Sequence, residues 1–108
     1  MLALEAEGLM GFDPADLDPV LESRVRVGVL ALLANGDRVD FTHLRDRMGV
    51  TDGNLATHLR RLEAARYVTL RKTFLARHSR TQYAVTPRGR AALERHVSAL
   101  ARALEGGS

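Results

Sequence analysis

The clearest pattern of apolar and polar positions lies in residues 51–62. Leu55, Leu59 and Leu62 recur at i, i+4 and i+7, so a helix would carry them as one apolar stripe. Small polar residues and arginines fall on the opposite side of such a helix. Thr51 can cap the first turn. The pattern predicts an amphipathic helix with a buried stripe and a polar outer face.

A shorter helix is predicted just before this one, after a short extended piece at residues 38–41. Leu44 and Met48 stand at i and i+4, Thr42 can cap the helix, and Gly49 can end it. A turn of about three residues then separates the two helices, which is the spacing of a helix-turn-helix.

The first long helix is predicted from Pro19 to about Ala34, with Asp18 as its cap. Residues 24–29 alternate like a strand, but helical spacing persists over the whole segment and favours a helix. Its apolar residues occupy two flanks, so we expect burial by its own core and by a second chain. The flank assigned to the second chain holds Val20, Val27 and Leu30.

The C-terminal third predicts a hairpin followed by a helix. Residues 67–74 and 81–85 have strand character, with Val68 and Leu70 pointing inward, and residues 75–80 form a basic loop between them. Thr86 then caps a helix that extends to about residue 105. This helix carries an apolar seam near heptad spacing, which we expect at a dimer interface. The seam consists of Leu93, Val97, Leu100 and Leu104.

Charge is distributed unevenly along the 108 residues. The net charge is +3, but residues 1–54 hold five arginines against ten acids, whereas residues 55–96 hold ten basic residues against two acids. A basic second half is typical of a protein with a polyanionic partner, although it is also compatible with a solvated basic face.

Composition excludes several classes of function. The chain has no cysteine, so disulfides and thiolate chemistry are excluded. The longest apolar run, residues 27–34, is too short to cross a bilayer, and the N-terminus does not resemble a signal peptide. We therefore expect a cytoplasmic protein of one domain at residues 18–105, with an N-terminal arm at residues 1–17 and a tail at residues 106–108.

The order of these elements resembles the small winged helix-turn-helix transcriptional regulators of bacteria and archaea, neighbours of the MarR and ArsR regulators. The resemblance covers about residues 18–105. The sequence segments that show it are residues 32–34, 39–44 and 51–63, Tyr67-Val68, and residues 80–83 and 86–90.

The resemblance implies an α+β, mainly α, winged helix with long terminal helices that form a homodimer. Residues 51–62 would be the recognition helix and residues 74–81 the wing. The cysteine-bearing metal motif of metal-sensing ArsR proteins is absent, and no effector pocket is recognisable, so an effector remains unknown.

The residues expected to contact double-stranded DNA lie on the outer face of the second helix and on the hairpin. Amide, hydroxyl and guanidinium groups at such positions can reach base edges and phosphates. The set is Thr51, Gly53, Asn54, Thr57, His58, Arg60, Arg61, Arg71, Lys72, Arg77, His78 and Arg80. For His58, which lies between the stripe and the outer face, a packed position is the alternative.

Other kinds of site are not indicated. The four histidines do not follow a metal-ligand spacing, so we expect no metal and no cofactor. A catalytic carboxylate pair, a phosphate-binding glycine loop and a nucleophile elbow are not recognisable, so we expect no enzyme. The sequence thus predicts a sequence-specific DNA-binding transcriptional regulator, and the resemblance implies that it is a repressor. The alternative is a winged-helix protein–protein interaction module that does not bind DNA.

Overall fold

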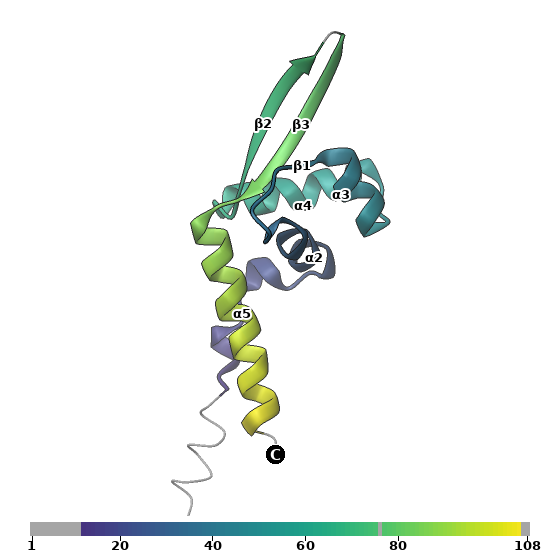
Figure 1. Cartoon of the computed structure of the whole chain (residues 1–108). Helices are drawn as coiled ribbons and strands as arrows, with labels where there is room; N and C mark the ends of the chain where they lie inside the picture. Colours follow the sequence, from purple (N-terminus) through teal and green to yellow (C-terminus); the bar gives the residue numbers. More distant parts are fainter. Residues whose placement is uncertain (1–11, 76, 107–108) are drawn as a thin grey trace, which may run out of the picture.

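The computed structural model of the chain describes residues 12–75 and 77–106 (Figure 1). Two short 3-10 helices come first, followed by four α-helices and three strands in a mainly helical α+β fold. Most of the predicted arm, residues 1–11, and the end of the predicted tail, residues 107–108, lie outside the described residues. In chain order the elements are η1 (Pro14–Asp16), η2 (Pro19–Leu21), α2 (Arg24–Leu33), β1 (Val39–Asp40), α3 (Phe41–Met48), α4 (Asp52–Ala64), β2 (Val68–Leu75), β3 (His78–Val85) and α5 (Pro87–Gly106).

The core lies where α2, α3 and α4 pack together beneath the sheet. The predicted stripe of α4 is confirmed, because Leu55, Leu59 and Leu62 are fully buried. They pack with Leu30 and Leu44 from the two other helices. Burying a leucine side chain contributes roughly 1.5–3 kcal/mol, so this cluster fixes α4 firmly to the body and leaves its other face free.

The first long helix begins later than predicted. Residues 19–21 form the separate 3-10 helix η2, which Asp18 caps through the backbone N–H of Val20 at 2.9 Å. The chain is extended at Ser23, whose hydroxyl accepts a hydrogen bond from the N–H of Arg26 at 3.2 Å and starts α2. The proline and its cap therefore mark a turn before the helix, and Ser23 is the true cap.

Thr42 is not the cap of α3, which corrects a second prediction. The helix begins at Phe41, and Asp40 occupies the cap position without a side-chain cap bond. The carboxylate of Asp40 is engaged instead by Arg80 and Gln82 of β3. At the other end Gly49 adopts a left-handed conformation, with φ of 66°, and ends α3 as predicted.

The hairpin is longer and tighter than predicted. The antiparallel pairing of β2 with β3 runs from Val68↔Val85 to Leu75↔His78, so most of the predicted loop at residues 75–80 belongs to the strands. Val68 is buried as expected, whereas Leu70 is 39% exposed because the hairpin has left the body by that point. β1 adds a third strand through Val39↔Tyr83 and gives the sheet order β1-β3-β2.

The molecule is elongated, with principal extents of 69 × 25 × 21 Å. The hairpin projects from one end of the helical body, and α5 extends from the other end (Figure 1). η1 packs against α5, with an ion pair of 3.2 Å between Asp16 and Arg102. This arrangement separates a projecting basic hairpin from a long terminal helix.

Candidate nucleic-acid interface

The outer face of α4 is open to solvent. Thr51, Gly53, Asn54, Thr57, Arg60 and Arg61 are all exposed. The hydroxyl of Thr51 caps the helix by accepting a hydrogen bond from the N–H of Asn54 at 3.1 Å, as predicted. A Cβ atom added to Gly53 would have no neighbour within 4 Å. A ligand backbone can therefore approach the first turn of α4 closely.

Thr57 and Arg60 are arranged by contacts within the helix. The hydroxyl of Thr57 donates to the carbonyl oxygen of Gly53 at 3.0 Å. The guanidinium of Arg60 donates to the Thr57 oxygen at 3.4 Å. The side chains of Thr57 and Arg60 are thus linked to each other and to the backbone of Gly53.

The two arginines of α4 lie on different flanks. Arg60 lies near Tyr83 of the sheet, where its charge lowers the pKa of that phenol against the larger raising effects of burial and Glu63. Arg61 lies on the side of α2, where its charge adds to burial in lowering the pKa of Arg26. Arg60 is therefore on the flank nearer the hairpin, and Arg61 is on the opposite flank.

His58 differs from the other residues predicted to contact DNA. It is half-buried, and its Nδ1 atom accepts a hydrogen bond from Arg26 Nη1 of α2 at 2.9 Å. Burial, together with the nearby Arg26 charge, lowers the pKa of the His58 imidazole. The ring therefore makes a contact between α4 and α2, which is the packed position that the sequence analysis gave as the alternative to a DNA contact.

Arg45 of α3 also borders the candidate interface, although the sequence pattern did not indicate it. Its guanidinium pairs with Asp52 of α4 at 2.9 Å and with Asp46 at 3.0 Å. Hydrogen bonds to Asp52 and then to Asp46 raise the pKa of Arg45. The pair joins the two helices across their turn and neutralises an acid at the exposed N-terminus of α4, where it would repel a phosphate backbone.

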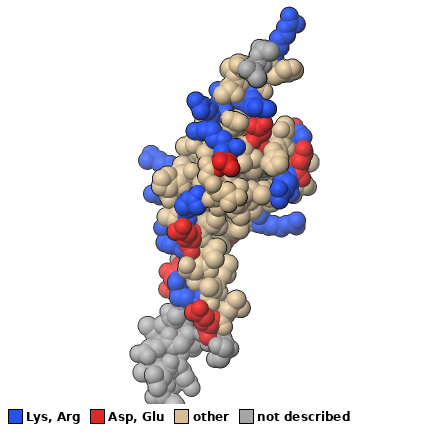
Figure 2. Space-filling view, in the orientation of Figure 1, with Lys and Arg blue, Asp and Glu red and all other residues tan. Residues whose placement is uncertain are grey.

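The hairpin supplies a second basic surface. Arg71, Lys72, Arg77, His78 and Arg80 are all exposed, as predicted. Figure 2 shows lysine and arginine side chains gathered along the hairpin and around its base, whereas the far part of α5 mixes both signs of charge. The basic surface therefore lies at the end of the molecule where the hairpin projects.

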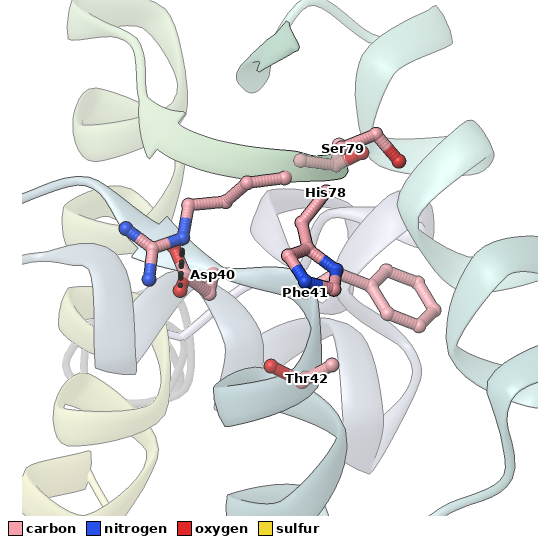
Figure 3. A pocket seen from close by; sticks show the side chains of 7 residues that line it. Asp40, Phe41, Thr42, His78 and Ser79 are labelled. Carbon is pink, nitrogen blue, oxygen red and sulfur yellow. Dashed lines mark ion pairs between the residues drawn. The ribbon is translucent and has the colours of Figure 1, made fainter. Parts of the chain in front are cut away.

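Arg80 is not entirely free. Its Nε atom lies 3.1 Å from Asp40 Oδ2, and the other oxygen of Asp40 accepts from Gln82 Nε2 at 2.9 Å. This pair borders an open concavity of about 500 Å³ between the hairpin and α3. Figure 3 shows His78 and Ser79 on the strand side and Phe41 and Thr42 on the helix side. Asp40 thus holds the hairpin at a defined place beside the helix-turn-helix.

The residues predicted at a dimer interface divide into three groups. Val97, Leu100 and Leu104 of α5 are 55%, 47% and 81% exposed, although they are apolar. Val20, Val27 and Leu93 are half-buried against the core of their own chain. Leu30 is fully buried in that core, so its predicted place at an interface is corrected.

The described residues also bear on metal binding and membrane spanning. In residues 12–75 and 77–106, no group of three or more histidine, aspartate or glutamate side chains could hold a metal ion. None of the helices in that described part has the length and apolar character needed to cross a membrane.

Residues 25–104 match the family model of the winged helix DNA-binding domain. A curated relative, the uncharacterized protein MJ0432 of Methanocaldococcus jannaschii, is 33% identical over 78 residues, which cover 72% of this chain and 85% of the relative. The transcriptional regulator homologue of Pyrococcus horikoshii OT3 is 26% identical, with a TM-score of 0.76 over 96% of this chain and 97% of that one.

Regulators solved with DNA share the same fold. The Mycobacterium tuberculosis regulator MosR, in complex with DNA, gives a TM-score of 0.65 at 23% identity, over 97% of this chain and 73% of that one. MarR-family regulators are also among the structures that share it. The predicted winged helix-turn-helix fold is therefore confirmed.

Proposed function

Because this chain belongs to the family of winged helix DNA-binding domains, we propose that it is a sequence-specific transcriptional regulator that binds double-stranded DNA as a homodimer. The observation that carries the proposal is the combination of an open polar face on α4 with a basic hairpin that projects beside it. Occupation of a promoter by such a dimer would repress transcription, and the regulator would act where the genome is, in the cytoplasm of a prokaryotic cell.

The proposed contacts assign different tasks to the two elements. The first half of α4 has few charges and an open Gly53, so we assign base reading in the major groove to Asn54 and Thr57. Arg60 and Arg61 anchor the helix to phosphates or guanines. The hairpin residues Arg71, Lys72, Arg77, His78 and Arg80 reach the flanking backbone and minor groove.

The homodimer is supported by the apolar row on α5. Three large apolar residues of this helix, Val97, Leu100 and Leu104, are about half exposed or more in the isolated chain. Apolar rows at this spacing pack against another helix. A pair of α5 helices, with Val20 and Val27 beside them, would set two α4 helices in successive major grooves, roughly 34 Å apart.

A salt titration tests the electrostatic part of the proposal. Each chain offers six exposed basic residues for phosphate contacts, namely Arg60, Arg61, Arg71, Lys72, Arg77 and Arg80. Six to ten contacts per dimer predict that affinity for random duplex DNA falls by about 10³–10⁵ between about 50 and 200 mM salt. Failure to bind duplex at low salt would overturn the proposal and favour a protein-interaction module.

Selection of bound sites from random DNA tests sequence specificity and the dimer together. We expect one preferred sequence with two inverted halves about 10 bp apart. The double variant Arg60→Ala with Arg77→Ala should bind the selected duplex more than about tenfold more weakly. The matched control is Arg90→Ala with Arg95→Ala, which removes two exposed cations from α5 and should bind like the wild type.

A further inference from the structure

Phe74 near the end of β2 is 78% exposed. Phenylalanine is among the residue types most often buried, and a ring held in solvent on a projecting hairpin is available to a partner. Its partner across the hairpin is Ser79, whose side chain is too short to cover a ring. Leu70, four residues earlier on the same face of the strand, is also exposed. The hairpin therefore carries an apolar surface that its own chain does not cover.

Cations precede and follow this ring along the hairpin. Strand alternation puts Lys72 on the same face as Phe74, and Arg77 lies in the turn beyond it. Arg80, opposite Thr73, belongs to the other face of the same hairpin. A partner of this surface must therefore combine strong negative charge with a surface on which an aromatic ring can stack. Duplex DNA has both properties, since its phosphates flank stacked base pairs.

We propose that Phe74 inserts as an apolar wedge between two adjacent base pairs, from the minor groove beside the site that α4 occupies, and kinks the duplex there. Side chains of this kind partly unstack a base step and bend DNA towards the major groove. The inference rests on the proposed function and adds a specific contact to it. The basic residues of the hairpin hold the phosphates on either side while the ring enters the step.

The wedge would also contribute to sequence preference without hydrogen bonds to bases. Pyrimidine–purine steps such as TA and CA are unstacked and kinked most easily. A duplex with such a step under the hairpin would therefore bind more tightly than one with a stiff step at the same place. Specificity would then come from α4 in the major groove and from DNA deformability at the hairpin.

Fluorescence of 2-aminopurine tests the inference. The probe is a duplex obtained by selection from random DNA, with 2-aminopurine placed in turn at each step flanking the site and with dyes at both ends for energy transfer. The wild-type protein should raise 2-aminopurine fluorescence at one flanking step and shorten the end-to-end distance. Phe74→Ala should abolish both signals and weaken binding roughly 5- to 150-fold, the range for loss of a base–aromatic stack.

Controls separate the wedge from general damage. Leu70→Ala removes an apolar side chain from the same face and should keep both signals, whereas Phe74→Leu keeps an apolar wedge and should retain part of the bend. The salt dependence of Phe74→Ala should equal that of the wild type, because the variant loses no phosphate contact.

Two fluorescence results would overturn the wedge while leaving the proposed function intact. One is tight binding by the wild type with no fluorescence change at any step. The other is an unchanged signal in Phe74→Ala. A variant that instead changes the sedimentation coefficient would show that the ring contacts protein, which also overturns the wedge. A wild-type protein that binds no duplex removes the proposed function and the wedge together.

Discussion

At the scale of single residues, His58 links the protonation of a side chain to the packing behind α4. Its Nδ1 accepts a hydrogen bond from Arg26, which an imidazolium could not do. Burial and the Arg26 charge lower the His58 pKa in the folded chain below the ordinary value of about 6.5. Arg61, which also lies near Arg26, adds positive charge to this place.

The lowered pKa predicts the direction of a pH effect on stability. As the pH falls below about 6.5, the unfolded chain binds a proton at His58 more readily than the folded chain does. The His58 contribution to stability is therefore fully present above pH 6.5 and is lost as the pH falls towards the lower folded pKa. The amide oxygen of the variant His58→Asn can still accept a hydrogen bond from Arg26, but the amide does not titrate. Between about pH 5 and 6.5, the midpoint of urea unfolding should therefore vary less for this variant than for the wild type. Equal variation in both proteins would contradict the assignment.

Gly53 offers a second prediction at this scale. A Cβ atom there meets no other atom, and alanine favours a helix over glycine by about 1 kcal/mol, so Gly53→Ala should raise the free energy of unfolding by up to that amount. If the DNA backbone approaches this turn closely, the same variant should bind DNA more weakly. Denaturant titration and DNA titration measure the two effects. A stabler protein with unchanged affinity would remove Gly53 from the interface.

Gly89 provides the contrast. A Cβ atom on Gly89 would lie 2.1 Å from the carbonyl oxygen of Tyr67, which is backbone and cannot move aside cheaply. Gly89→Ala should therefore destabilise the fold, by about 1–3 kcal/mol if the helix can shift. The two glycines differ because one faces solvent and the other lies where α5 crosses the start of the hairpin.

At the scale of elements, the ion pair between Asp40 and Arg80 holds the wing beside α3. In the proposed complex, a DNA phosphate would compete with Asp40 for the guanidinium of Arg80. Asp40→Asn keeps an oxygen for Gln82 but removes the negative charge beside Arg80. The freed guanidinium should bind a phosphate, so affinity at low salt should rise. The slope of log affinity against log salt should steepen by up to about 0.9 per chain.

The control for this variant is Asp37→Asn, which makes the same charge change at an exposed position just before β1. If both variants tighten binding equally, only the net charge matters. If Asp40→Asn binds more weakly with an unchanged slope, the pair is needed to position the wing rather than to restrain Arg80.

Elements with long apolar periods were predictable from the sequence. The stripe of α4 and the seam of α5 repeat over several turns, so their spacing shows that both elements are helices, and for α4 it also shows which face is buried. Boundaries depended on contacts with distant residues. The hydroxyl of Thr42 predicts a cap, but Asp40 occupies the cap position of α3, and its carboxylate contacts β3. Pro19 predicts an earlier helix start than Ser23, the residue that caps α2.

The extent of the wing and part of the candidate site were also not predictable from local sequence patterns. The turn of the hairpin does not contain glycine, proline or asparagine, so the sequence did not show how far the strands continue. Arg66 has a φ of 64° after α4, a position where glycine is usual, and so α4 ends without its common signal. The roles of Arg45 and His58 arise from contacts across a turn and between helices. The periodicity of apolar residues gives no information about such contacts.

At the scale of the whole molecule, the hairpin and the C-terminal part of α5 lie towards opposite ends (Figure 1). The hairpin carries exposed basic residues and α5 carries the exposed apolar row. The wing and α4 can therefore contact DNA while α5 contacts a second copy. Binding through two α4 helices makes the second contact intramolecular, which typically strengthens binding by a factor of about 10²–10⁴. The affinity of the proposed regulator should consequently depend on a helix that touches no DNA.

Leu100→Glu tests this dependence. Leu100 is 47% exposed in the isolated chain, so glutamate there leaves the core intact but puts a charge into the proposed contact between α5 helices. Sedimentation should show a dimer for the wild type and a monomer for the variant, and affinity for a two-half selected duplex should fall by about 10²–10⁴. Affinity for a single half-site should stay the same.

Ser98→Glu adds the same charge on another side of α5, where Ser98 is exposed, and should remain a dimer. A monomeric wild type that binds only single half-sites would instead mean that the apolar row serves a different partner.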